Sequence, residues 1–376
     1  MDYKKLQDKC RGSLVGGAVG DALGYEVEFM SLNAIRRNFG QQGITGYTPN
    51  PEGVAQFSDD TQMTLFTLEG LMNGIIATQA GKPEEILPHI AKAYLNWYKT
   101  QTEAAAAQPD SWLSNLKTLW SRRAPGNTCM NALSNINLGI TYRNNSKGCG
   151  GVMRMAPIGI FNAVHSNLYS YDDTAHLAGW AAEVTHHHVM STFASALLAT
   201  TVENCIQREE THRMEFEWIV NGGLIEMSRY FPGNDAELDR FCYLVRRAME
   251  LGKDDDIPEE EAIRELGEGW IAEEAIAIAI FCVMRHIDSF EDCIISAVNH
   301  DGDSDSTGAI AGNIIGAILG YSAIPRRFLD TLEVEPVLVS AADDLCANIE
   351  DPDVNRRIGE RYILHQPSGM APSHLL

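Results

Sequence analysis

Two short segments concentrate side chains that could bind a cation. The first, residues 57–61, reads FSDDT and precedes an amphipathic run of apolar residues. Ser58 or Asp59 could cap the start of a helix there, and carboxylates suit a helix N-terminus. A cap needs one oxygen acceptor, whereas this segment offers four oxygen-bearing side chains. The excess of oxygen atoms indicates a role beyond capping.

The second segment, residues 299–308, reads NHDGDSDSTG. Its three carboxylates, Asp301, Asp303 and Asp305, would repel one another unless a cation neutralised them. Carboxylate and hydroxyl oxygens are hard ligands, which suit Mg²⁺, Mn²⁺ or Ca²⁺ rather than Zn²⁺. An EF-hand loop is not favoured, because Ser306 stands where that loop needs glycine and Gly312 where it needs glutamate.

Together the two segments supply enough oxygen ligands for two divalent metal ions. Paired metals about 3.5–4 Å apart can orient a substrate and activate a water molecule. The sequence contains no GxSxG elbow and no cysteine–histidine signature that would indicate a covalent nucleophile. The residues therefore favour metal-assisted hydrolysis, provided that the fold brings the two segments together.

Two further segments are open to more than one interpretation. Residues 144–154 read NNSKGCGGVMR, and their glycines would let the backbone approach a phosphate, although an ordinary flexible turn has the same composition. The segment is not a P-loop, because no GK[ST] follows. The histidines at 186–188 have no HExxH pattern and no suitably spaced cysteine, so hydrogen bonding is favoured over metal ligation.

The elements that must position these groups are helical. Apolar residues recur at helical spacing through most of the chain, and Gly and Pro clusters separate the helices. No linker, low-complexity tract or solenoid repeat interrupts the pattern. We therefore predict one all-α domain over residues 1–376, with helices near 6–24, 60–75, 85–100, 128–138, 177–206, 214–230, 236–251, 259–266, 270–287, 290–299, 307–321, 326–332 and 354–364.

Two of the predicted helices carry glycine at every fourth position. Glycines at 12, 16, 20 and 24 form one series, and those at 308, 312, 316 and 320 form the other. This spacing places glycines along one face of a helix, where each lowers helix stability by about 1 kcal/mol relative to alanine. Close approach of the two helices would compensate, and would bring Asp21 near the residue 301–305 segment.

Composition and charge narrow the class of protein. The chain has 376 residues, 45% of them hydrophobic, and a net charge of −22. Such a charge disfavours a nucleic-acid partner and an anionic membrane. We expect no membrane-spanning segment and no signal peptide, and therefore a cytoplasmic protein. The eight cysteines include no CxxC pair, so we expect them to be reduced.

Five motifs, in order, give the chain its resemblance to a known family. The chain resembles the ADP-ribosylglycohydrolases, specifically the bacterial branch that includes dinitrogenase reductase-activating glycohydrolase. The matching segments span residues 10–321 and read RGSLVGGAVGDALG from 11, FSDDT from 57, SKGCGGVMRMAP from 146, THHH from 185 and DGDSDS from 301. Residues 325–376 match nothing that identifies a role.

The resemblance implies a single compact, orthogonal helical bundle with two Mg²⁺ or Mn²⁺ ions at the base of a cleft. The residues it implies as metal ligands are Ser58, Asp59, Asp60, Asp303, Asp305 and Ser306. It implies Glu28 and Asp303 as catalytic residues, with Glu28 beside the scissile bond. It implies that the substrate is held by Gly148, Cys149, Gly150, Gly151, Val152, Met153, Arg154 and His188.

The activity implied is hydrolysis of the glycosidic bond between ADP-ribose and a protein side chain, most often arginine in this branch. Alternatives are hydrolysis of ADP-ribosyl-serine or of a free ADP-ribose derivative, and a non-catalytic protein that binds ADP-ribose or a toxin. An intact set of metal ligands favours the enzyme. The chain departs from the family at Asp301, where glycine is usual, and serines at 304 and 306 replace the commoner threonines.

Overall fold

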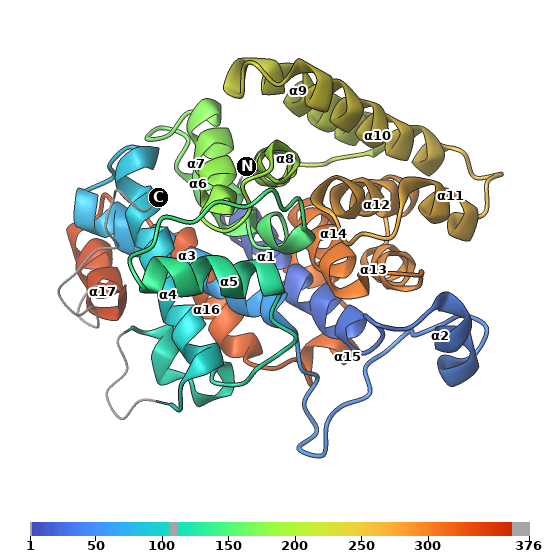
Figure 1. The fold of residues 1–376 in the computed structure, drawn as a ribbon, viewed down its shortest axis with the longest axis horizontal. Helices are drawn as coiled ribbons and strands as arrows, with labels where there is room; N and C mark the ends of the chain where they lie inside the picture. The colour runs from blue at the N-terminus through green and yellow to red at the C-terminus, as the bar shows by residue number, and fades with distance from the viewer. Residues whose placement is uncertain (1, 106–110, 363–376) are drawn as a thin grey trace.

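Helices make up the regular secondary structure of the computed structural model, which describes residues 2–105 and 111–362 (Figure 1). Two isolated β-bridges, Ala55 to Leu332 and Gly148 to Ile271, tie loops together. The α-helices are α1 (Tyr3–Tyr25), α2 (Leu32–Phe39), α3 (Asp59–Thr78), α4 (Pro83–Thr102), α5 (Asn127–Asn137), α6 (Ala156–Val164), α7 (Tyr171–Glu183), α8 (Val189–Gln207), α9 (Arg213–Tyr230), α10 (Asp235–Lys253), α11 (Glu259–Leu266), α12 (Ala272–Arg285), α13 (Phe290–Val298), α14 (Ser304–Leu319), α15 (Arg326–Leu329), α16 (Glu335–Leu345) and α17 (Pro352–Tyr362).

The predicted all-α class is confirmed, with one wrong element and three missed ones. The single helix expected over 177–206 is two helices, α7 and α8. Residues 184–188 separate them, because His188 takes an extended conformation and its side chain accepts a hydrogen bond from the Met190 amide to cap α8. Sequence reasoning missed α2, α6 and α16; α6 is apolar on all sides, so it has no periodicity to detect. Residues 363 and 364 of the last predicted helix lie outside the described residues.

Helices α1 and α14 cross the middle of the fold as an antiparallel pair (Figure 1). Their glycine series face each other: a Cβ atom on Gly20 would lie 2.0 Å from the Gly308 carbonyl oxygen, and one on Gly316 would lie 2.0 Å from that of Gly12. The two backbones therefore touch with no room for side chains. The expected close packing of the two glycine stripes is confirmed.

Reciprocal hydrogen bonds fix the register of this pair. The Ser13 hydroxyl donates to the Asn313 carbonyl at 2.8 Å, and the Asn313 side-chain amide donates to the Ser13 carbonyl at 2.8 Å. Both residues are buried. This register places the C-terminal end of α1, followed by Glu28, beside the N-terminal end of α14, which begins directly after Asp303.

The other helices surround this pair. Helices α6, α7 and α12 pack on α8, α4 packs on α3, and α9 and α10 lie along one outer edge (Figure 1). Helix α8 is long and apolar enough to cross a membrane, but 89% of that stretch is buried against the rest of the protein. The apolar composition of α8 is explained by its burial in the core of the protein.

Candidate active site

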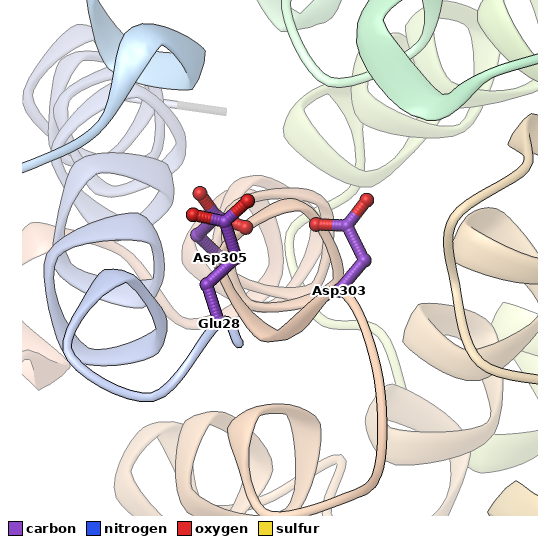
Figure 2. Close-up of side chains that lie close together, drawn as sticks. All are labelled: Glu28, Asp303 and Asp305. Atoms are coloured by element: carbon purple, nitrogen blue, oxygen red, sulfur yellow. The ribbon is translucent and has the colours of Figure 1, made fainter. Parts of the chain in front are cut away.

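Three carboxylates converge where α1 ends and α14 begins. Glu28 follows α1, Asp303 directly precedes α14, and Asp305 lies in the first turn of α14. Each contributes a carboxylate oxygen to a group whose atoms all lie within 4.8 Å of one another (Figure 2). All three side chains are buried. The backbone contact between α1 and α14 is therefore what brings residues nearly 280 positions apart into one cluster.

The first motif joins this cluster from the N-terminus of α3. Ser58 caps that helix by accepting the Asp60 amide at 3.1 Å, so its hydroxyl is engaged within the motif. Asp21, fully buried on α1, accepts the Ser58 amide at 2.8 Å, and both the amide and the hydroxyl of Thr61. Asp21 thus anchors the start of α3 to α1, near Asp305 as expected from the glycine spacing.

A cavity of about 530 Å³ opens above the carboxylates. Its acidic wall consists of Glu28, Asp59, Asp60, Asp303 and Asp305, with Ser306 beside them. The two segments picked out by their oxygen-bearing side chains therefore face the same space. Of the six predicted metal ligands, five line the cavity, and Ser58 lies behind them as the helix cap.

The opposite wall contains the predicted glycine loop. Gly148, Cys149, Gly150 and Met153 line the cavity. The Cys149 thiol donates a hydrogen bond to Asp303 Oδ2 at 2.7 Å, so the loop reaches across to the carboxylates. This loop has the small side chains and free space that a bound diphosphate needs.

Four residues expected at the ligand do not line this cavity. Gly151 and Val152 are buried, and the Arg154 side chain is fully buried in the core. His188 caps α8 and borders a neighbouring cavity instead. His186, two residues earlier in the same motif, lies on the wall of the carboxylate cavity.

Several cavity residues were not singled out from the sequence. Phe29 and Trp270 form a stacked pair at the rim, with ring centroids 6.0 Å apart. Phe29 is 76% exposed, which is unusual for a large apolar side chain. This exposure is the signal that identifies Phe29 as a candidate site residue, and the sequence alone does not show it. The rest of the wall comes from the loop before α5 and from its first turn, namely Arg122, Ala124, Pro125, Gly126, Asn127, Thr128 and Cys129.

Several buried carboxylates at the cavity have raised pKa values. Burial, and then repulsion by Asp305, raises the pKa of Glu28 to about 9 and that of Asp21 to about 7. The same two causes raise the pKa values of Asp59, Asp60 and Asp303 well above the ordinary range. Several negative charges cannot share this buried space unless protons or cations neutralise them.

The donor set fits hard divalent cations. Glu28 Oε2 and Asp60 Oδ2 are buried and have no hydrogen-bond partner among the described residues. Buried carboxylate oxygens normally have partners, and these two point to a ligand atom that completes them. Every side chain in the cluster offers oxygen, which suits Mg²⁺ or Mn²⁺. Glu28, Asp59, Asp60, Asp303, Asp305 and Ser306 are the residues that would hold such ions.

We expect the protein without divalent cation to lose stability as the pH rises. The folded-state pKa values of Asp21 and Glu28, about 7 and about 9, exceed their ordinary values of 3.8 and 4.5. The folded state therefore binds more protons than the unfolded state, and this contribution is lost as the pH rises through the folded-state values.

Thermal melts in EDTA at about pH 5, 7 and 9 should show a falling midpoint, and excess Mg²⁺ should reduce the fall. A midpoint that is independent of pH in EDTA would contradict the repulsive cluster. The same melts on Glu52→Gln, an exposed acid outside the cluster, should match the unmodified protein.

Comparison with known proteins finds one family over almost the whole chain. The model of the ADP-ribosylglycohydrolase family matches residues 2–355. An uncharacterised protein of Archaeoglobus fulgidus is 28% identical over 90% of this chain and 96% of its own. The ADP-ribosyl-[dinitrogen reductase] glycohydrolase of Rhodospirillum rubrum is 25% identical, covering 89% and 94%. The ADP-ribosylarginine hydrolase Tri1 of Serratia proteamaculans is 24% identical, covering 90% and 79%.

The fold is also found among solved structures. A chain described as an ADP-ribosylglycohydrolase-related protein complex superposes with a TM-score of 0.59 at 23% identity. The match covers 91% of this chain and 98% of the solved chain. At this identity the likeness concerns the arrangement of helices.

Proposed function

The chain belongs to the ADP-ribosylglycohydrolase family. From this premise we propose that it hydrolyses the glycosidic bond between ADP-ribose and a protein side chain. We propose arginine as that side chain. The observation that carries the proposal is the cavity itself. Five carboxylates form one wall, and a glycine-rich loop that could hold a diphosphate faces them. Family membership supports a hydrolase, and the cavity supplies the groups that such a hydrolysis needs.

We propose that the activity depends on two divalent cations, Mg²⁺ or Mn²⁺, held by the acidic wall. When bound, such ions supply positive charge that polarises ribose hydroxyls and a water molecule. What supports this is the set of buried carboxylates. Glu28 Oε2, after α1, and Asp60 Oδ2, on α3, have no hydrogen-bond partner among the described residues, and Glu28 lies beside Asp303 and Asp305. The identity of the metal and the number of ions are both part of this proposal.

The chain's own residues divide the remaining work. The glycine loop of residues 148–150 binds and orients the diphosphate, so that the anomeric carbon lies over the carboxylates. Glu28, or Asp303 beside it, takes the proton from the attacking water when bound cations keep its carboxylate ionised. The negative wall stabilises the positive charge that develops on the sugar as the bond breaks, as carboxylates do in glycoside hydrolysis.

Two observations support arginine as the side chain released. The Serratia relative has arginine in its name. At the cavity rim, the stacked rings of Phe29 and Trp270 expose aromatic surface beside Glu28. A guanidinium group is attracted both to aromatic faces and to carboxylates. A serine linkage or a free ADP-ribose derivative would make no use of this rim.

The test is release of ADP-ribose from an arginine-ADP-ribosylated protein, with a serine-linked substrate in parallel. We expect release from arginine with Mg²⁺, and a loss of more than about 100-fold in EDTA. Release from serine alone would retain the reaction and overturn the choice of side chain. No release from either substrate by a protein that still binds ADP-ribose would favour a free-nucleotide substrate or a binding protein.

Other predictions from the sequence stay predictions. We propose that residues 1–376 act as one domain in the cytoplasm, on an ADP-ribosylated protein partner and without nucleic-acid or membrane partners. The charge of −22 supports the last part, because both of those partners are themselves anionic. Gly151, Val152, Arg154 and His188 keep their predicted substrate role only if they act through neighbouring groups.

A further inference from the structure

Arg154 is a fully buried guanidinium that forms no ion pair within the described part of the chain. It lies over the Tyr94 ring, 4.1 Å from the ring centroid, and donates hydrogen bonds to Thr185 Oγ1 at 2.7 Å and the Ala181 carbonyl at 3.4 Å. Its Nε has no partner. Burying a cation without a carboxylate is costly, so this arrangement calls for an explanation other than stability.

The Thr185 hydroxyl links Arg154 to the cavity. Because a guanidinium can only donate, Thr185 Oγ1 accepts from Arg154, and its own proton remains free to donate. Its acceptors at measured distances are His186 Nδ1 at 2.9 Å and the Ala182 carbonyl at 3.5 Å, and it also lies beside the Cys129 thiol, which is a weak acceptor. The distance favours His186 Nδ1, because 3.5 Å is beyond the range of a good O–H hydrogen bond.

His186 is a neutral imidazole in this environment. Burial, with the positive charge of Arg154 as the next cause, lowers the pKa of His186 to about 3. A neutral ring carries one N–H group, and the nitrogen that accepts a hydrogen bond is the one without the proton. If Nδ1 accepts from Thr185, the proton must lie on Nε2.

The Nε2 side of the ring faces the glycine loop. A Cβ atom added to Gly148 would lie 3.4 Å from His186 Nε2, and one added to Gly150 would lie 3.3 Å from it. His186 lines the cavity, and no acceptor for Nε2 is present among residues 2–105 and 111–362. The N–H group is therefore beside the loop that faces the carboxylates, and it is free to donate to a ligand.

We infer that Arg154 is a positioning residue, which through the Thr185 hydroxyl holds His186 as an Nε2–H donor aimed into the cavity at an oxygen atom of the ligand. The hydrogen bonds from Arg154 to Thr185 and from Thr185 to His186 follow from the contacts alone. The identity of the acceptor, an oxygen of the diphosphate, rests on the proposed function. Arg154 would thus serve ligand binding without touching the ligand, which explains a buried cation directly behind the glycine loop.

The test is the tautomer of His186 in the full chain, read from long-range ¹H–¹⁵N correlation spectra after selective ¹⁵N labelling of histidine. His186→Gln identifies the signal. At neutral pH we expect the Nε2–H tautomer in the unmodified protein. An Nδ1–H tautomer, or a protonated ring, would overturn the inference. Because this spectrum needs no substrate, it decides the inference even if the proposed hydrolysis fails.

Two substitutions at Thr185 separate the hydrogen bond from packing. Thr185→Val keeps the shape but removes the hydroxyl, so we expect a mixture of tautomers and about 10-fold weaker binding of ADP-ribose by calorimetry. Thr185→Ser keeps the hydroxyl and should restore the single tautomer and most of the affinity. An Nε2–H tautomer that persists in the valine variant would show that Thr185 does not set it.

Discussion

Asp305→Asn is expected to remove ADP-ribose release while making the metal-free protein more stable. Asp305 lies at the centre of the cluster, and its charge raises the pKa values of Asp21, Glu28, Asp59 and Asp60. Neutralising it removes that repulsion, which we expect to raise the free energy of unfolding in EDTA by about 1–3 kcal/mol. The gain should be larger at pH 9 than at pH 5, because more of the neighbouring carboxylates are then ionised.

The activity of this variant should fall by more than about 100-fold, since even the loss of an outer-shell partner costs about 10–100-fold in a metal site. Urea unfolding in EDTA and the release assay in Mg²⁺ measure the two effects. Glu52→Gln, which removes an exposed charge outside the cluster, is the matched control and should change neither the stability nor the activity. A variant that kept normal turnover would refute the metal role of Asp305.

Gly20→Ala is expected to destabilise the protein by about 3 kcal/mol or more. The added Cβ would lie 2.0 Å from the Gly308 carbonyl oxygen and 2.3 Å from its carbonyl carbon. Both atoms belong to the backbone of α14, which cannot turn aside as a flexible side chain could. Helices α1 and α14 would have to separate, and overpacking of a tight core commonly costs about 1–3 kcal/mol even where side chains can adjust.

Gly222→Ala makes the same chemical change but is expected to have the opposite effect on stability. Gly222 lies within α9, and a Cβ there would meet no atom within 4 Å. Alanine is the better helix former by about 1 kcal/mol, so this variant should be slightly more stable. Urea unfolding compares the two variants. Equal effects at positions 20 and 222 would mean that the close contact between α1 and α14 does not form.

The carboxylate site could be predicted because its parts are local in sequence. Asp59 and Asp60 are neighbours, and Asp303 and Asp305 lie two residues apart, so each pair reaches the same space whatever the rest of the fold does. The glycine spacing predicted that Asp21 lies near residues 301–305, because bare helix faces at four-residue intervals favour backbone contact. That the Asp59 and Asp60 pair reaches the same space depends on the hydrogen bonds between Asp21 and the start of α3, which the sequence does not show. The helix pair was thus predicted from residue type rather than from hydrophobicity.

The opposite wall could not be predicted in the same way. Trp270 reaches the cavity because the Cys149 amide bonds to its carbonyl, a contact between residues more than a hundred positions apart. Which histidine of the 186–188 run faces the cavity depends on where α8 begins, and no glycine or proline marks the break at residues 184–188. The positive charge of Arg154 would suit a phosphate ligand, but contacts with Tyr94 and Thr185 hold its side chain in the core.

The pairing of α1 with α14 also constrains how the chain acquires its structure during synthesis. Ser13 and Asn313, whose side chains bond the two helices together, are separated by 300 residues. A ribosome adding about 5–20 residues per second needs about 15–60 s to make that stretch. Until then the glycine face of α1 has no partner, and contacts of such long range slow folding. The nascent chain therefore emerges for most of its length without its central helix pair, which makes it a natural client for chaperones.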